Sequence, residues 1–177
     1  QAGYRCEGGG PEEGGSWRFG ARGAGSLFEQ AVDADGNFVS KWGQFGSGSE
    51  DFQYPEMITV DPSGFIYITD SGNVRVCKYD PNGVLVTQWG SVGSGPGEFS
   101  YPQGIAADAQ GHIYVTDIGN ERVQKFDADG NFLLEWGSIG SDPGMFQFPS
   151  DVAVDASGHV YVADSGNMRI QKFTSGG

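Results

Sequence analysis

Hydrophobic and aromatic residues alternate with polar ones in short runs along most of this 177-residue chain. A representative run is Phe65–Thr69, in which isoleucine alternates with an aromatic residue. Runs of this length and composition, separated by turn signals that contain Asp, Asn and Gly, are typical of β-strands. No stretch shows the sustained 3.6-residue period of an amphipathic helix. The pattern therefore predicts an all-β fold.

The runs recur at a fixed interval, because Pro55, Pro102 and Pro149 stand 47 residues apart in equivalent contexts. A repeat of this length indicates an array of like units, and four antiparallel strands per unit is the pattern of a β-propeller blade. We expect first strands at Met57–Val60, Ile105–Ala107 and Val152–Val154, second strands at Phe65–Thr69, His112–Thr116 and His159–Ala163, third strands at Arg75–Tyr79, Arg122–Phe126 and Arg169–Phe173, and fourth strands at Val84–Trp89 and Asn131–Trp136.

A single blade cannot bury both of its faces, so neighbouring blades must supply each other's core. Large aromatic residues at equivalent positions of the copies suit this packing. They are the tryptophans that end the fourth strands, Trp42, Trp89 and Trp136, and the tyrosines of the second strands, Tyr67, Tyr114 and Tyr161.

The repeat divides the chain into an arm and a propeller part. Residues 1–29 are a Gly-rich arm that ends in a degenerate connector, and residues 30–177 hold the blades. Asn37–Trp42 has the pattern of a fourth strand, but the middle of its repeat is skipped. We therefore expect an orphan fourth strand within 30–43, full blades at 44–90 and 91–137, and a blade that lacks its fourth strand at 138–177.

Three motifs carry a family resemblance: the Gly-rich connector Gly90–Pro102, the strand pair in Val154–Phe173, and the D-x-D-G turn with its W-G ending in Asp127–Gly137. Together they resemble the NHL repeat, over roughly Trp17–Phe173. NHL-type repeats usually form six-bladed propellers, so the resemblance implies that this chain is half of a six-bladed ring. It implies little about activity, because such folds serve in binders, enzymes and structural proteins alike.

Three blades do not close a ring, since propellers have about four to eight. One interpretation is a homo-oligomer in which two copies make six blades, each spare strand Asn37–Trp42 completing the last blade of the other copy. Another is that further blades belong to a longer chain. A third is an open head-to-tail stack, which propagates as a filament.

The net charge of the chain restricts the classes of partner that it can bind. The chain has 23 acidic and 10 basic residues and a formal net charge of −13, which argues against a nucleic acid partner because phosphate binding needs a basic surface. No apolar run is long enough to span a membrane, so no membrane partner is expected. The chain opens without Met or a signal-like apolar segment, and we expect a processed extracellular or secreted protein, or a piece of a longer one.

Candidate chemistry is sparse. Cys6 and Cys77 stand at unlike positions and make neither a metal pair nor a disulfide framework; Cys77 replaces the glutamine of the other copies, and Cys6 is expected to be a free thiol in the arm. His112 and His159 lie at equivalent turns without a clear set of partners. Asp33–Asn37 and its counterpart Asp127–Asn131 faintly resemble the start of a calcium loop but lack the closing Glu, so turns are expected. We predict no catalytic residue, no metal and no cofactor.

The motif D-x-G-N-x-R places an Asp and an Arg five residues apart in every copy, within reach of a bidentate ion pair. Such pairs could line a ligand site or pin one blade to the next. Identity in all copies favours the structural role. The predicted inter-blade pairs are Asp70 with Arg75, Asp117 with Arg122, and Asp164 with Arg169.

Positions that differ between the copies are better candidates for binding. In a propeller, the connector into the first strand and the loop between the second and third strands share one face. Several apolar residues on that face could form a docking patch. The nine positions are Glu56, Gln103 and Ser150, then Val74, Glu121 and Met168, and finally Phe45, Val92 and Ile139.

Three functions follow as hypotheses. The first is a non-enzymatic module that binds a protein or glycan partner through its loop face. The second is a self-assembling structural unit, as a closed dimer or an extracellular filament. The third is a metal-assisted lyase or hydrolase, which the family resemblance allows.

Overall fold

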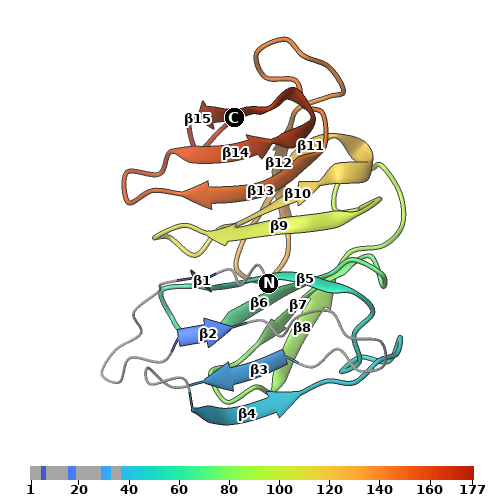
Figure 1. The fold of residues 1–177 in the computed structure, drawn as a ribbon, viewed down its shortest axis with the longest axis vertical. Coiled ribbons are helices and arrows are strands. Elements are labelled where there is room, and N and C mark those ends of the chain that lie inside the picture. Colours follow the sequence, from blue (N-terminus) through green and yellow to red (C-terminus); the bar gives the residue numbers. More distant parts are fainter. Residues whose placement is uncertain (1–4, 7–15, 19–28, 33–36) are drawn as a thin grey trace.

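The computed structural model describes residues 5–6, 16–18, 29–32 and 37–177, and nearly all of their regular structure is β. The strands form four antiparallel sheets; along the long axis of the molecule, the first two sheets of the chain occupy one half and the last two sheets occupy the other half (Figure 1). Each sheet takes its strands in chain order, as propeller blades do. The expected all-β, bladed architecture is confirmed.

The sheets are named here by their order in the chain. The N-terminal sheet contains β1 (Arg5–Cys6), β2 (Ser16–Arg18), β3 (Glu29–Val32) and β4 (Phe38–Trp42). The first blade contains β5 (Pro55–Val60), β6 (Ile66–Asp70), β7 (Arg75–Tyr79) and β8 (Leu85–Trp89). The second contains β9 (Pro102–Ala107), β10 (Ile113–Asp117), β11 (Arg122–Phe126) and β12 (Phe132–Trp136). The third contains β13 (Pro149–Val154), β14 (Val160–Asp164) and β15 (Arg169–Phe173). Two single-turn 3-10 helices connect strands: η1 (Ile118–Asn120) lies between β10 and β11, and η2 (Ser165–Asn167) lies between β14 and β15.

Burial follows the position of a strand within its blade. Every residue of the central strands β6, β7, β10 and β11 is buried, because these strands are covered on both faces by neighbouring blades. The outer strands β8 and β12 alternate between half-buried and exposed residues, so one face packs inward and the other meets solvent.

The core lies between the blades, not within them. One cluster joins Tyr67 and Val76 of the first blade to Ile105 and Phe126 of the second. The tryptophan that ends each outer strand packs against the next sheet. Ring centroids lie 5.7 Å apart for Trp89 and Phe126, 5.8 Å for Trp136 and Phe173, and 6.0 Å for Trp42 and Tyr79.

The structure differs from the sequence-based expectation in the N-terminal sheet. Asn37–Trp42 was expected to be an orphan fourth strand, but β4 pairs with β3 and is the outer strand of a four-stranded sheet. Two of the strands before it, β1 and β2, are short and fall in the Gly-rich arm, whose composition gives little sign of them. No helix in the described part of the chain is long and apolar enough to cross a membrane.

Candidate functional site

The long loops of all three blades lie at one end of the sheets, which we call the loop face. It consists of the connectors 43–54, 90–101 and 137–148 and the loops 71–74, 118–121 and 165–168. Backbone hydrogen bonds join each connector to the loop of its blade, as when Gly72 donates to the Gln53 carbonyl at 2.6 Å and Ile118 to the Tyr101 carbonyl at 3.0 Å. These bonds hold the loop face at fixed positions relative to the strands.

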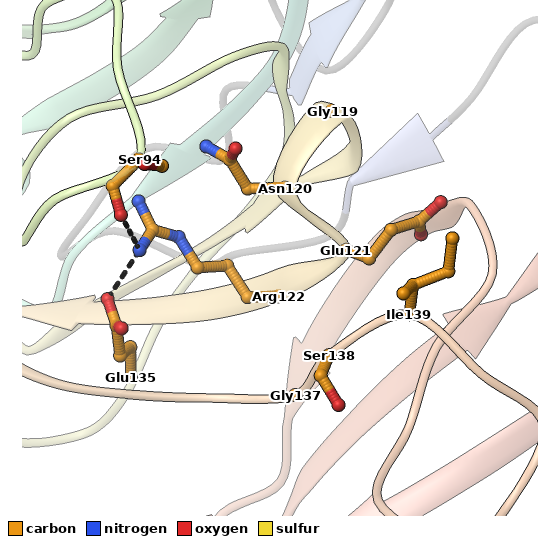
Figure 2. Close-up of a pocket in the computed structure, with 9 residues that line it drawn as sticks. All are labelled: Ser94, Gly119, Asn120, Glu121, Arg122, Glu135, Gly137, Ser138 and Ile139. Atoms are coloured by element: carbon orange, nitrogen blue, oxygen red, sulfur yellow. Dashed lines mark hydrogen bonds and ion pairs between the residues drawn. The ribbon is translucent and has the colours of Figure 1, made fainter.

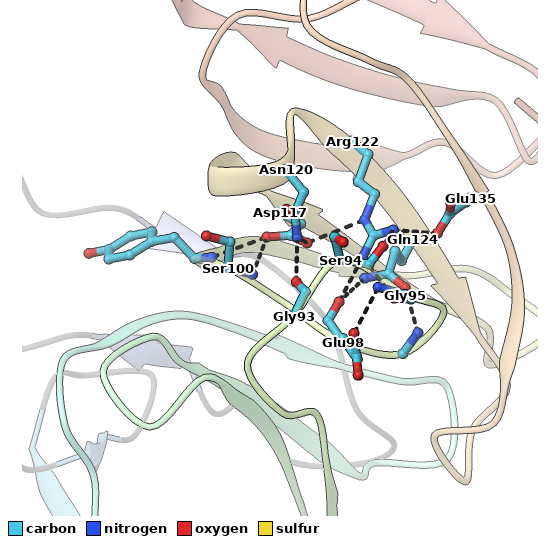
Figure 3. Close-up of polar contacts among 12 residues, drawn as sticks. Gly93, Ser94, Gly95, Glu98, Ser100, Asp117, Asn120, Arg122, Gln124 and Glu135 are labelled. Atoms are coloured by element: carbon cyan, nitrogen blue, oxygen red, sulfur yellow. Dashed lines mark hydrogen bonds and ion pairs between the residues drawn. The ribbon is translucent and has the colours of Figure 1, made fainter.

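The repeated Asp and Arg residues form the base of this face (Figure 3). In the second blade the Asp117 carboxylate accepts from Arg122 Nε at 3.3 Å, from Asn120 at 2.7 Å and from the Ser100 backbone at 2.9 Å. Arg122 also donates to Glu135 and to three connector carbonyls, those of Ser94, Gly95 and Glu98. Its five bonds match the five N–H donors of a guanidinium, which leaves none for a ligand.

This geometry corrects the expected placement of the pairs. They were expected to bridge two blades, but each Asp is the cross-strand neighbour of its Arg within one sheet, as Asp70 is of Arg75. What each pair ties down is the connector that arrives from the preceding sheet. In the third blade, burial of Asp164 acts to raise its pKa, but the Gln147 N–H, the Asn167 amide and the Arg169 guanidinium together lower it.

Four of the nine candidate binding residues are exposed on the loop face. Phe45, Val92 and Ile139 project from equivalent places in the three connectors, and Met168 from the loop 165–168. Val74 and Glu121 are half-buried counterparts of Met168, and all three residues have a left-handed backbone with φ between 53° and 55°. Glu56, Gln103 and Ser150 are half-buried near the starts of β5, β9 and β13.

Sequence reasoning missed three residues of this face. Tyr54, Tyr101 and Phe148 are exposed and directly precede the proline that opens the first strand of each blade. The Tyr101 hydroxyl donates to Glu56 at 2.9 Å, and the Phe148 backbone donates to Glu121 at 2.6 Å, so both contacts cross from one blade to the next. In the sequence, an aromatic residue precedes this proline in every copy, but the pair indicated only the repeat and not an exposed position on the loop face.

The apolar residues gather on this face. Of the twelve large hydrophobic side chains that are exposed in the described residues, seven belong to it. They form what we call the apolar patch: Phe45, Tyr54, Val92, Tyr101, Ile139, Phe148 and Met168.

A pocket of about 440 Å³ opens beside the patch (Figure 2). Two candidate residues, Glu121 and Ile139, line it together with Ser138. Arg122 closes its base through the contacts to Ser94 and Glu135 described above. Burial raises the pKa of Glu121, the Phe148 N–H opposes that effect, and the Asp164 charge adds to it. The other lining residues are Gly119, Asn120 and Gly137.

The histidines lie at the opposite end of the blades. His112 Nδ1 contacts Asp108 at 2.8 Å, and His159 Nδ1 contacts Asp155 at 3.0 Å, each within its own turn. The Asp127–Asn131 segment is a turn of the same kind, in which Asp127 accepts from two backbone N–H groups; the Asp33–Asn37 motif lies mostly outside the described residues. Across the described ranges, no three His, Cys, Asp or Glu side chains are grouped to hold a metal ion.

Cys77 is fully buried in β7, and burial raises the pKa of its thiol to about 12. Such a thiol is unreactive. The side chain of Cys6 lies outside the described residues.

The family model of the NHL repeat matches residues 52–79, 99–126 and 146–173. Each match runs from the end of a connector through the third strand of a blade, so it contains both the Asp–Arg pair and the aromatic-Pro pair. No curated protein matches the chain in sequence.

Several solved structures share the fold. Virginiamycin B lyase from Staphylococcus aureus is 18% identical, with a TM-score of 0.60 over 96% of this chain and 54% of the lyase. A calcium-binding protein, regucalcin, from Agrobacterium tumefaciens is 22% identical, with a TM-score of 0.58 over 91% of this chain and 51% of its own. A protein of unknown function from Bacteroides caccae is 15% identical, with a TM-score of 0.63 over 92% and 60%. This chain thus spans just over half the length of these proteins, and the likeness shows the fold alone.

Proposed function

Because this chain carries three NHL repeats that form blades of a β-propeller, we propose that it is a non-enzymatic binding module whose loop face docks a partner protein. The observation that carries the proposal is the apolar patch, which holds seven of the twelve exposed large hydrophobic side chains. Exposed large apolar side chains that share one face of a protein, among polar residues, are typical of an interaction site.

The composition of the patch suits a protein partner. Tyrosine, phenylalanine and methionine are enriched at protein interfaces, where aromatic residues fill pockets of the partner. The loops that present them are held by backbone hydrogen bonds and by the saturated Arg122 network, so little ordering is needed on binding.

The surround of the patch indicates the charge of the partner. Glu50, Asp51, Glu56 and Asp142 belong to the same connectors and first strand, and the whole chain carries a net charge of −13. A partner with a basic rim is therefore attracted and oriented, and a nucleic acid is repelled.

Affinity capture from a native extract tests the proposal, with quantitative mass spectrometry as the readout. The test variant changes Val92 and Ile139 to Ser. Its matched control changes Val86 and Leu133 to Ser, which are exposed apolar residues of the outer strands β8 and β12. We expect the test variant to lose a captured protein that the control retains.

Equal capture by both variants would exclude the loop face as the docking surface. A glycan array probed with the same two variants examines the glycan alternative: signal that depends on the patch there, without any captured protein, would replace a protein partner by a carbohydrate. The metal-assisted lyase or hydrolase lacks comparable support, because within the described residues His112 and His159 each contact only an Asp, in separate blades.

A further inference from the structure

The pocket beside the apolar patch has a counterpart in the first blade, because each of its nine lining residues has an equivalent 47 positions earlier in the chain. Six of the nine are identical in the two sets. Isoleucine in place of valine keeps a third position apolar, so two added carboxylates are what distinguish the pocket. The three differences are Glu121 for Val74, Glu135 for Gln88 and Ile139 for Val92.

We propose that this pocket receives arginine side chains of the partner protein that docks on the apolar patch. The inference rests on the proposed function, because that function supplies the partner. It adds the type of residue that the partner carries beside its apolar contacts, and it assigns the recognition of that residue to Glu121 and Glu135.

The charge of the pocket favours a cation. Arg122 lies 3.3 Å from Asp117 and 2.7 Å from Glu135, and all five of its N–H donors are used. With Glu121, one positive and three negative side chains leave a formal charge of −2. The equivalent group of the first blade has one guanidinium, one carboxylate and two neutral side chains, so its formal charge is zero; it consists of Arg75, Asp70, Gln88 and Val74. A cationic side chain is therefore attracted to the second-blade pocket and not to its counterpart.

Both pocket carboxylates can accept further hydrogen bonds. Glu135 Oε2 accepts from Arg122, and the Glu135 side chain is 38% exposed. Glu121 Oε2 accepts from the Phe148 N–H at 2.6 Å. In each carboxylate, the other oxygen has no hydrogen bond from the described part of the chain. The two residues stand on opposite sides of the pocket (Figure 2), so each can pair with a guanidinium that enters from solvent.

The pocket is continuous with the apolar patch. Ile139 lines the pocket and is 73% exposed, and Phe148, which donates to Glu121, belongs to the patch as well. The stem of an arginine can therefore lie on Ile139 while its guanidinium reaches a carboxylate. Burial and the charge of Asp164 raise the pKa of Glu121, and a cation beside it would offset both effects. A partner bound to the patch thus places its rim over the pocket.

An NMR titration of the whole chain with a defined peptide tests the pocket. The probe is the acetylated and amidated pentapeptide GRGRG, and its control carries citrulline, which is neutral and similar in shape, in place of both arginines. The amide signals of Gly119 and Gly137 report on the pocket lining. At low salt, we expect the arginine peptide to shift both signals and to bind at least about fivefold more tightly than the citrulline peptide, which lacks the charge-assisted bonds.

Two matched protein variants separate the pocket from the general negative charge of the chain. Glu121→Gln with Glu135→Gln removes two charges but keeps both hydrogen-bond acceptors, since Gln88 has this role in the first blade. Glu50→Gln with Asp142→Asn removes two charges from the connectors and none from the pocket. We expect the first variant to lose the preference for arginine over citrulline and the second to keep it.

Equal affinity for the two peptides, an equal loss in both variants, or shifts that spare Gly119 and Gly137 would overturn the proposal. Calcium ions that shift these two signals and displace the peptide would overturn it in favour of a metal ion. The capture experiment separates this inference from the docking function. If the patch variant loses a protein that the Glu121, Glu135 variant retains, docking stands and the arginine pocket falls. If the patch variant loses nothing, docking falls, and the titration alone decides whether the pocket binds arginine.

Discussion

The prediction with the largest expected effect concerns Arg122, which holds a connector and a carboxylate at once. Replacing it by Met keeps most of the stem and removes the guanidinium. The fully buried Asp117 is then left with a charge whose main cationic partner is gone, and the Ser94, Gly95 and Glu98 carbonyls lose their donor. Breaking a buried ion pair in this way costs about 3–5 kcal/mol. For a chain of this size, this corresponds to a fall in Tm of about 6–20 °C.

The third blade provides a matched control. Arg169→Met removes the same kind of group, but Arg169 is more exposed and its bond to an outer-strand side chain is absent from the described residues. We expect a smaller loss of stability, roughly half of that for Arg122→Met. Urea unfolding followed by tryptophan fluorescence measures both, with Trp89 and Trp136 at the blade interfaces as probes. If Arg122→Met costs less than about 1 kcal/mol, or no more than Arg169→Met, the network is not what secures the connector.

Further predictions concern the turns, acid stability and the buried thiol. Gly130 has a φ of +86°, and a Cβ there would lie 2.6 Å from the Trp89 ring. Gly130→Ala should therefore lower the free energy of unfolding by about 2–4 kcal/mol, as measured by thermal unfolding. The control Gly111→Ala should lower it by only about 1 kcal/mol, because Gly111 has a similar φ but open space around it. The pKa of Asp164 is lowered in the folded state, so the ionised carboxylate stabilises the fold above its unfolded pKa of about 4, and this stabilisation is lost as pH falls through the folded pKa. In the wild-type chain the urea midpoint should therefore fall between about pH 6 and pH 3, and Asp164→Asn should make that fall shallower. An unchanged slope would contradict this. In a Cys6→Ser background, Cys77 should resist thiol reagents until the chain unfolds, and rapid labelling of the native protein would show that the first blade opens.

Much of the fold could be predicted because the same local physics returns three times. The strand, turn and tryptophan positions follow from period-two alternation and from Asp and Gly at fixed offsets, and β6, β10 and β14 lie within one residue of their expected bounds. The first strands begin earlier than expected, at Pro55, Pro102 and Pro149, because proline is tolerated as the first residue of a strand.

The site was harder to predict, because its residues are conspicuous only in three dimensions. Tyr54, Tyr101 and Phe148 look like core aromatics in the sequence, yet the left-handed backbone of Tyr54 and Phe148 helps to place them on the surface. The partners of Arg122 are mostly backbone carbonyls, which no side-chain pattern reveals. The N-terminal sheet escaped prediction because strands of two to four residues in a Gly-rich segment carry too little periodicity.

Because side chains of the blade hold each connector by hydrogen bonds, the fold should not depend on an unbroken backbone within that connector. Pro96 is exposed in the connector of the second blade. Before it, Arg122 donates to the carbonyls of Ser94 and Gly95. After it, the Gln124 amide accepts from the Gly97 N–H and donates to the Glu98 carbonyl. A protease that nicks the chain at Pro96 would therefore cut a covalent link whose two ends stay bound to the same side chains, while Trp89 remains packed on Phe126. The two fragments should stay together as a non-covalent complex, and they should reassemble when they are produced as separate polypeptides.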